Sequence, residues 1–191
     1  MFNEALQFLL KSIVDLFVLA ALVRFFLQYF QAPFRNPLSE FVNALTDFAV
    51  KPLRRLIPGW RGLDLASLVF ALGLEILLVL FLLVLKGVPV WTAGPHIVPL
   101  LLLLSIINLL KYCIYLLIAA VFIQAILSWV SPYSPISSVL ESVTRPFMKP
   151  LRKLIPTVGR VDLSPLALFL ICQLILMIPL AWLEQIAIKM I

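Results

Sequence analysis

The chain has 191 residues, of which 63% are hydrophobic and 13% charged, and its mean hydropathy is +1.13. A soluble domain carries about 25% charged residues, so this chain lacks the polar surface that a soluble protein presents to water. Its formal net charge of +6 lies mostly in loops between apolar runs. Membrane topology and anionic lipid explain that charge better than nucleic acid does.

Four apolar runs follow one another along the chain. They cover about residues 5–30, 65–85, 105–130 and 163–188, and each is long enough for the ~20 residues that cross a bilayer core. We expect the first run to be retained as a span, because no small-residue cleavage pattern of a signal peptide follows it. The sequence therefore predicts an all-α integral membrane protein with four transmembrane helices.

The second half of the chain repeats the first. Residues 51–58 read KPLRRLIP and residues 149–156 read KPLRKLIP, and at the same spacing Asp64 corresponds to Asp162. A fixed offset over so many identical positions indicates internal duplication. We interpret the chain as two tandem units, residues 1–96 and residues 97–191.

Each unit contains two predicted spans, so both units enter the membrane in the same direction, as parallel repeats. The loops at residues 31–64 and 131–162 then face one side of the membrane, and they hold most of the Lys and Arg. The positive-inside bias predicts that this side is cytoplasmic. Both termini are then expected to face outward.

Residues 97–130 are longer than one membrane-spanning helix of this topology requires. As a single helix they would extend about 51 Å, whereas the bilayer core is about 30 Å thick. We therefore predict a break near Ser105–Asn108. Residues 97–104 would then lie in the outer interface or form a tilted extension.

Both basic loops show apolar residues at helical spacing, after Pro37 and Pro135, with polar residues on the other faces. This pattern predicts amphipathic helices that lie in the membrane interface. Pro52 and Pro150 are each expected to begin a new helical segment, because proline suits a first helical turn. The cations of the repeated motif either anchor the loops to lipid or form a docking surface for a cytoplasmic partner or an acidic lipid. These cations are Lys51, Arg54, Arg55, Lys149, Arg152 and Lys153.

Two aspartates, Asp64 and Asp162, each follow a turn and directly precede an apolar run. This placement is typical of an N-cap, in which the carboxylate accepts hydrogen bonds from free amides of the first helical turn. Pairing with the nearby Arg61 and Arg160 is the alternative.

Polar residues within the predicted spans are candidates for function, because they are costly in lipid. Lys11 and Asp15 stand one helical turn apart, where they can neutralise each other. Glu75 and its counterpart Gln173 are expected to make a structural contact or to line a polar path. The full set is Lys11, Asp15, Arg24, Glu75, Lys111, Gln173 and Glu184, with Lys111 and Glu184 expected to pair between helices.

Motifs of several enzyme and cofactor classes are missing from the sequence. It has no Gly-rich phosphate-binding loop and no CxxC, and His96 is its only histidine, so we predict no catalytic, cofactor or metal site. Cys113 and Cys172 fall inside apolar runs, where small packing residues are the expected role. We therefore expect no enzyme activity.

With its two KPLR[RK]LIP segments, the Asp-Leu after each, and Arg24 and Trp129 near the ends of the preceding helices, the chain resembles the YggT family. The resemblance covers nearly the whole chain and includes the tandem duplication of proteobacterial YggT proteins, whereas related proteins of the YlmG type carry a single copy. It implies a bacterial inner-membrane protein. Members of the family are associated with tolerance of osmotic or envelope stress, with ion balance or with division, and in plastids with cytochrome assembly. Such links rest on family analogy.

Two functional hypotheses follow. In the first, the protein is a non-enzymatic scaffold or accessory protein whose basic amphipathic loops bind anionic lipid headgroups or a protein partner. A cell-division or membrane-complex assembly factor is a further alternative. In the second, it transports ions or assists a transporter through its intramembrane polar residues. Neither hypothesis involves nucleic acid.

Overall fold

A computed structural model of the chain describes residues 2–33, 36–60, 62–87, 97–131, 134–155 and 162–189. The described part is helical and contains no β-strand. Four of its helices are long and apolar enough to cross a membrane, namely Asn3–Tyr29, Leu65–Leu85, Ile97–Ser128 and Ser164–Ile188. The predicted class, a multi-pass helical membrane protein with four spans, is confirmed.

The elements follow the same order in both units. In the first unit a long helix, an amphipathic helix and a second long helix are α1 (Phe2–Tyr29), α2 (Pro37–Leu56) and α3 (Leu65–Leu85). In the second unit α4 (Ile97–Val130) and α5 (Pro135–Leu154) are followed by a span in three pieces. These pieces are α6 (Ser164–Ile175), the π-helical turn η2 (Leu176–Leu180) and α7 (Ala181–Ile188).

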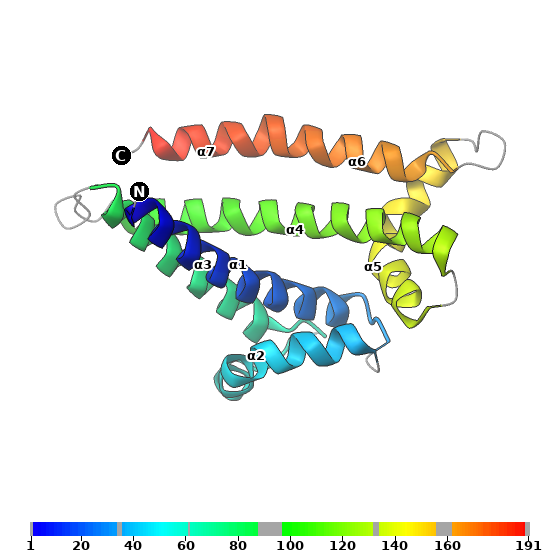
Figure 1. Cartoon of the computed structure of the whole chain (residues 1–191), viewed down its shortest axis with the longest axis horizontal. Coiled ribbons are helices and arrows are strands. Elements are labelled where there is room, and N and C mark those ends of the chain that lie inside the picture. Colours follow the sequence, from blue (N-terminus) through cyan, green and yellow to red (C-terminus); the bar gives the residue numbers. More distant parts are fainter. Residues whose placement is uncertain are drawn as a thin grey trace.

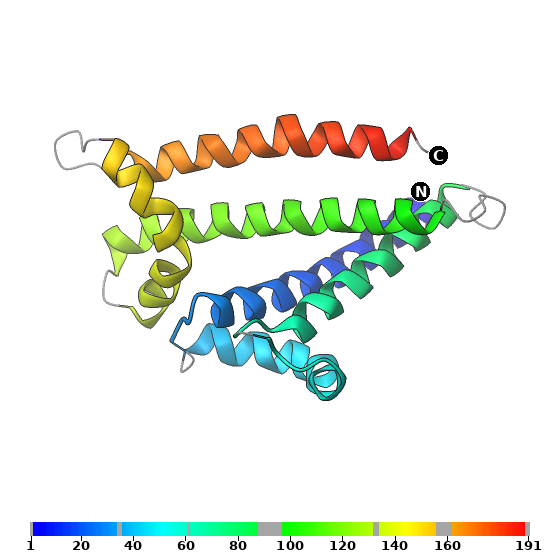
Figure 2. The ribbon, with the colours of Figure 1, turned by 180° about the vertical axis from the view of Figure 1, so that it is seen from behind.

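Helix α4 lies between the α1/α3 pair on one side and the α6–α7 span on the other, as both ribbon views show (Figures 1 and 2). Small side chains allow α1 and α3 to approach closely, since Ala21 and Ala71 are fully buried together with Val18 and Leu22. The second unit has a separate core in which Val121 of α4 packs with residues of α5 and α6.

The predicted break in the third span is wrong. Helix α4 continues through Ser105 for 34 residues and contains no break. Its first turns are used in packing, because Leu101 joins a cluster with α3, and Leu100 and Ile107 pack against Ala187 of α7. One side of the additional helix length is therefore packed against α3 and α7, while Val98 and Leu102 on its other side are exposed.

The prolines of the repeated motif also act differently from the prediction. Pro52 lies inside α2, and Pro146 and Pro150 lie inside α5, so neither helix starts afresh there. A proline within a helix removes one backbone hydrogen bond and bends the axis. Figure 1 shows this bend in α2, whose last turns are seen end-on while its first turns run across the view.

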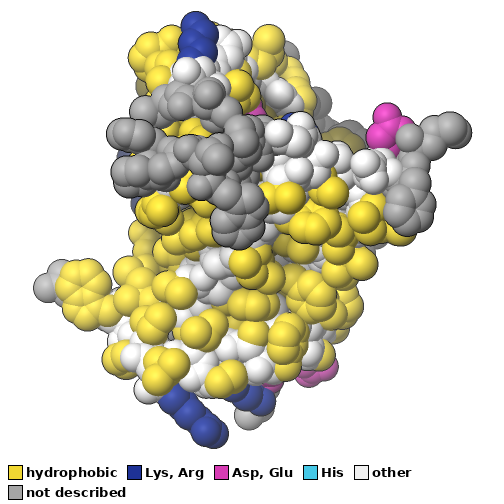
Figure 3. All heavy atoms as spheres, turned by 90° about the vertical axis from the view of Figure 1, so that its left-hand side faces the viewer, with side chains coloured by type: hydrophobic (Ala, Val, Ile, Leu, Met, Phe, Trp, Pro, Cys, Tyr) yellow, Lys and Arg dark blue, Asp and Glu magenta, His cyan; other side chains and the backbone are white. Residues whose placement is uncertain are grey.

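Much of the outer surface is apolar, as expected for a chain surrounded by lipid. Figure 3 looks at the end of the molecule that bears the termini, and hydrophobic side chains cover most of its described surface. On α2, Phe41 and Phe48 are largely exposed, whereas the smaller Val42, Thr46 and Val50 face the bundle. Phe48 nevertheless reaches the ring of Phe17 on α1 edge-on.

The continuity of α4 yields a prediction at Ser105, whose side chain is fully buried and whose hydroxyl has no hydrogen-bond partner among the described residues. Ser105→Pro should lower the free energy of unfolding by about 3 kcal/mol, because proline interrupts a helix interior. Ser105→Ala, which removes only the unsatisfied hydroxyl, should leave stability unchanged or raise it. Thermal unfolding in detergent, followed by circular dichroism, measures both; tolerance of proline would indicate a broken helix.

Candidate functional site

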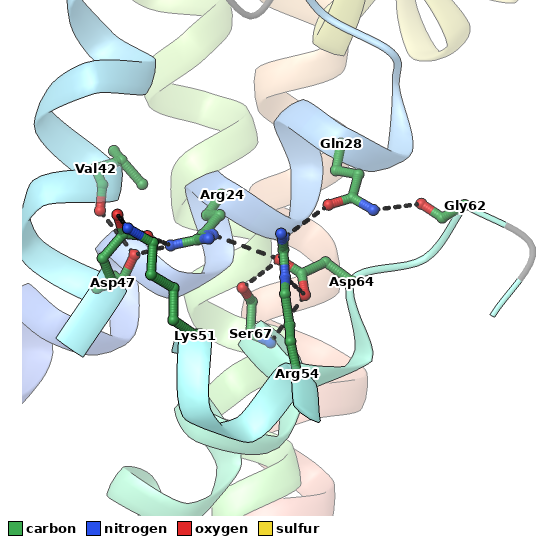
Figure 4. A network of polar contacts seen from close by, with 10 residues as sticks. Arg24, Gln28, Val42, Asp47, Lys51, Arg54, Gly62, Asp64 and Ser67 are labelled. Carbon is green, nitrogen blue, oxygen red and sulfur yellow. Dashed lines mark hydrogen bonds and ion pairs between the residues drawn. The ribbon is translucent and has the colours of Figure 1, made fainter. Parts of the chain in front are cut away.

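A network of charged side chains joins all three helices of the first unit (Figure 4). At its centre Arg24, near the end of α1, donates from Nη1 to Thr46 Oγ1 and to Asp47 Oδ1 of α2, both at 2.8 Å. The Arg24 side chain is only 9% exposed, so this charge is held almost entirely inside the protein. A cation in that position requires a partner, and Asp47 provides it.

Asp64 is the second acidic partner, and it combines the predicted N-cap role with an ion pair. As the N-cap of α3 it accepts hydrogen bonds from the Ser67 amide at 3.4 Å and the Ser67 hydroxyl at 2.6 Å. It also pairs with Arg54, whose Nε and Nη2 lie 3.1 and 2.5 Å from its oxygens. The cation is thus Arg54 of the repeated motif, while Arg61 lies outside the described residues.

Further contacts close the network around the two aspartates. Arg24 Nε lies 3.5 Å from Asp64 Oδ2, so the two acidic groups share one buried cation. Gln28 links α1 to the loop before α3, since its side-chain oxygen accepts from Arg54 at 3.0 Å and its nitrogen donates to the Gly62 carbonyl at 3.2 Å. The network therefore fastens α2 and the start of α3 to the end of α1.

The second unit contains a reduced version of the same arrangement. Gln124 stands where the first unit has Arg24, and it accepts from Thr144 Oγ1 at 2.5 Å. Arg152 pairs with Asp162 at 2.9 Å, as Arg54 pairs with Asp64. The position of Asp47 is taken by the exposed Arg145. A neutral amide requires no counter-ion. The second unit, which has Gln124 in place of the buried arginine, therefore does not need an acidic residue at the position of Asp47.

The capping contact shifts by one residue between the units. Asp162 accepts from the Ser164 amide at 2.9 Å and lies one position before the N-cap of α6, so the predicted N-cap role is displaced. The residue corresponding to Ser67 is Pro165, which has no amide hydrogen to donate. The carboxylate therefore binds the next available amide. Arg160, its predicted alternative partner, lies outside the described residues.

The hydrogen bonds of these carboxylates lower their pKa values. Burial raises the pKa of the Asp64 carboxyl, but hydrogen bonds from Arg54 and Ser67 outweigh burial and hold the pKa below its usual value. For Asp47 the hydrogen bond from Lys51, at 2.8 Å, is the main cause of a lowered pKa. Both groups are therefore charged near neutral pH.

The six cations of the repeated motif fall into two groups. Lys51, Arg54 and Arg152 are engaged in ion pairs with the protein's own aspartates. The other three are exposed and form no ion pair among the described residues; these are Arg55, Lys149 and Lys153. Only the second group is free to meet a partner without breaking an internal contact.

The polar residues within the spans form contacts between the units. Glu75 of α3 is 1% exposed and accepts from Asn108 Nδ2 of α4 at 2.7 Å, while its second oxygen has no hydrogen-bond partner among the described residues. Asp15 of α1 accepts from the Tyr112 hydroxyl of α4 at 2.6 Å. Asn108 and Tyr112 were not identified from the sequence, although their four-residue spacing places them on one helix face.

Other intramembrane residues show mixed outcomes. Lys111 and Glu184 approach to 2.5 Å, which is the interhelical pair expected from their depth. Lys11 is exposed and forms no ion pair with Asp15 in the described part of the chain. Gln173 is half-buried and has no hydrogen bond there either. Glu75 meets Asn108 of α4, whereas no described residue lies within hydrogen-bonding distance of the Gln173 amide.

The network predicts a pH-dependent stability. Because folding lowers the pKa of the Asp64 carboxyl below its usual value of 3.8, its contribution is complete above about pH 5 and is lost as the pH falls below about 4. Asp64→Asn should lower the free energy of unfolding at pH 7 by about 3 kcal/mol. This is the lower end of the range for breaking a buried ion pair, because the Arg54 side chain is 41% exposed and solvent screens its charge. It should also flatten the loss of stability in acid.

The matched control for this prediction is Asp162→Asn. Asp162 makes the corresponding ion pair in the second unit but is 33% exposed, so a smaller loss of stability is expected. Thermal unfolding in detergent between pH 3 and pH 7 compares the variants with the parent chain. Equal effects of the two substitutions would contradict a special role for the buried network.

Comparisons with known proteins agree with this architecture. The family model of CCB3/YggT matches the chain in two segments, residues 3–85 and 103–183, one in each unit. An uncharacterised protein of Pseudomonas aeruginosa is 40% identical over 175 residues, covering 91% of this chain and 87% of that protein. The uncharacterised protein YggT of Escherichia coli K12 is 38% identical, covering 90% and 87%. No solved structure gives a significant match. The chain therefore belongs to the CCB3/YggT family.

Proposed function

We propose that the protein is a non-enzymatic scaffold or accessory protein of the bacterial inner membrane, acting through the face that carries α2 and α5. The observation that carries this proposal is the division of the repeated cations into two groups. Arg54 and Arg152 are engaged in holding the helices together, whereas Arg55, Lys149 and Lys153 are exposed on the same proline-containing segments. The exposed cations are not needed for the internal ion pairs, which supports a role in contacts outside the chain.

The surroundings of these cations suit a membrane-proximal binding surface. Leu56 and Leu154 follow the cations at the ends of α2 and α5 and are among the most exposed large apolar residues. Cations flanked by exposed apolar side chains are typical of helices that lie at a lipid headgroup layer or bind an acidic partner there. By the positive-inside bias, this face is the cytoplasmic one.

The test removes only the exposed charges. A triple variant with Arg55→Gln, Lys149→Gln and Lys153→Gln should lose its partners, because its internal ion pairs remain while its outward charge is gone. In intact cells, crosslinking followed by quantitative mass spectrometry of the purified protein should show partner recovery reduced about tenfold, which corresponds to about 1.4 kcal/mol. The identity of the partners then distinguishes a division or assembly role from another accessory role.

A matched control removes three exposed charges from the opposite end of the molecule. It carries Lys11→Gln, Lys86→Gln and Lys189→Gln, all at exposed positions. This variant should recover the same partners as the parent chain. If both triple variants retain every partner, the exposed cations are not the binding surface and the scaffold proposal fails.

Ion transport is the second candidate, favoured by the polar cluster of Asp15, Glu75, Asn108 and Tyr112 inside the bundle. The packing around it favours a structural role instead. The buried apolar layer formed by Val18, Ala21, Leu22, Ala71 and Leu109 lies along α1 and α3 between this cluster and the Arg24 network. A continuous hydrated path through that layer would have to displace fully buried side chains.

We therefore expect no ion flux through the purified protein. Liposomes that contain it should show K⁺, Na⁺ and H⁺ flux equal to that of protein-free vesicles, because the apolar layer separates the two polar clusters. Glu75→Gln serves as the specificity control in the same assay. A flux present in the parent chain and abolished by Glu75→Gln would establish transport in place of the scaffold role.

A further inference from the structure

Two cavities of different character lie next to each other, one within the first unit and one at its junction with the second. The first, of about 380 Å³, is lined by Arg24, Leu27, Gln28, Ser39, Asn43 and Arg54. The second, of about 460 Å³, lies between α1, α4 and α5 and has an almost wholly apolar lining. Leu27 lines both cavities, and Leu38 of the apolar cavity is followed directly by Ser39 of the polar one. Each has the size of a typical small-molecule site.

The polar cavity is suited to an anion. Among the described residues two guanidinium groups contribute to its lining and no carboxylate does, while Asp47 and Asp64 pair with these arginines from outside the cavity. Arg24 is nine-tenths buried, and its Nε makes no hydrogen bond among the described residues; the nearest acidic oxygen is Asp64 Oδ2, in an ion pair at 3.5 Å. A buried N–H that makes no hydrogen bond can still donate one, and a charge-assisted hydrogen bond to an anionic oxygen is a strong one.

The second unit does not preserve these features. At the positions that correspond to Arg24 and Asn43 it has Gln124 and Glu141, so it has lost a cation and gained a carboxylate. The ion pair between Arg152 and Asp162 and the hydrogen bond of Thr144 are nevertheless retained. The shared fold therefore does not require an anion-suited cavity, and this feature is specific to the first unit.

The apolar cavity indicates which other chemical group the ligand must contain. Its lining comes from the end of α1 and Phe30 after it, from Leu38 of α2, and from residues between 113 and 123 of α4 and between 139 and 147 of α5, at the same end of the bundle as the Arg24 network. Phe30, directly after α1, and Phe147 of α5 approach edge-to-face beside it, with ring centroids 6.1 Å apart. A ligand that fills both cavities must carry a negative charge on a flexible apolar chain.

We propose that this junction binds one phospholipid with an anionic headgroup, drawn from the leaflet on the α2 and α5 side. Its phosphate occupies the polar cavity beside Arg24 and Arg54, and an acyl chain enters the apolar cavity between the units. The bound lipid would bridge α1 and α2 of the first unit to α4 and α5 of the second. This site uses different residues from the exposed cations Arg55, Lys149 and Lys153.

The experiment measures lipid retained by the purified full-length chain. After equilibration in nanodiscs of equal parts phosphatidylglycerol and phosphatidylcholine, native mass spectrometry counts the lipids that survive extraction. The parent chain should retain one phosphatidylglycerol with a preference of about fivefold or more, since a cation near an anionic lipid contributes about that factor. Equal retention of the two lipids would overturn the proposal.

Variants locate the site. Asn43→Asp places a carboxylate in the polar cavity and should reduce the preference to about onefold, whereas Ser142→Asp, outside both cavities on α5, should leave it unchanged. Ala120→Phe and Val143→Phe fill the apolar cavity and should reduce retention of both lipids. An unchanged preference in Asn43→Asp, or full retention in both filled variants, would place the lipid elsewhere and refute the assignment.

Two further arms separate this site from other anion-binding explanations. Excess glycerol phosphate, a free headgroup analogue, should not displace the lipid, because it has no acyl chain; displacement would show a simple anion site and overturn the phospholipid assignment. The triple variant of Arg55, Lys149 and Lys153 should keep the lipid preference. Loss of preference there would assign lipid selectivity to the exposed face and refute the cavity site.

Discussion

The buried guanidinium of Arg24 is the interaction on which the arrangement of the first unit depends. A cation that is 9% exposed near the end of a membrane span needs acidic partners, and the chain supplies one from α2 and one from the start of α3. Asp47 and Asp64 can reach it only if both segments fold back against α1. The amphipathic helix is thus attached to the bundle through charge, while its large aromatic side chains remain available to lipid.

The second unit shows how the same architecture is maintained at lower electrostatic cost. Gln124 replaces the buried cation and bonds to Thr144, so α5 is still connected to α4 by a polar contact. The pair between the motif arginine and the aspartate after the loop is present in both units, at Arg54–Asp64 and Arg152–Asp162. This shared pair connects each amphipathic helix to the start of its second span. The additional Arg24 pairing is peculiar to the first unit.

Contacts between the units are of a different kind. The polar contacts of Asp15 and Glu75 both reach α4, and Val139 of α5 packs against Leu27 of α1. The units therefore join through the first helix and the amphipathic helix of the second one. This heterologous junction creates the apolar cavity, since the two units meet along surfaces that are not copies of each other.

The amino-acid sequence by itself determined the membrane class, the four spans, the duplication and the amphipathic character of the two loops. These features follow from local hydropathy and from identities at a fixed offset, which need no knowledge of neighbours in space. Capping by Asp64 and the pair of Lys111 with Glu184 were also within reach, because helix starts and depth can be estimated along the chain.

Tertiary structure decided which polar groups meet. That Arg54 reaches Asp64, that Glu75 contacts Asn108, and that α4 continues through Ser105 all depend on packing between segments distant in sequence. A buried charge selects its partner by geometry, and hydropathy alone does not encode that geometry. The same motif therefore contains residues that hold the protein together and residues that are free for binding, and only their three-dimensional surroundings distinguish the two.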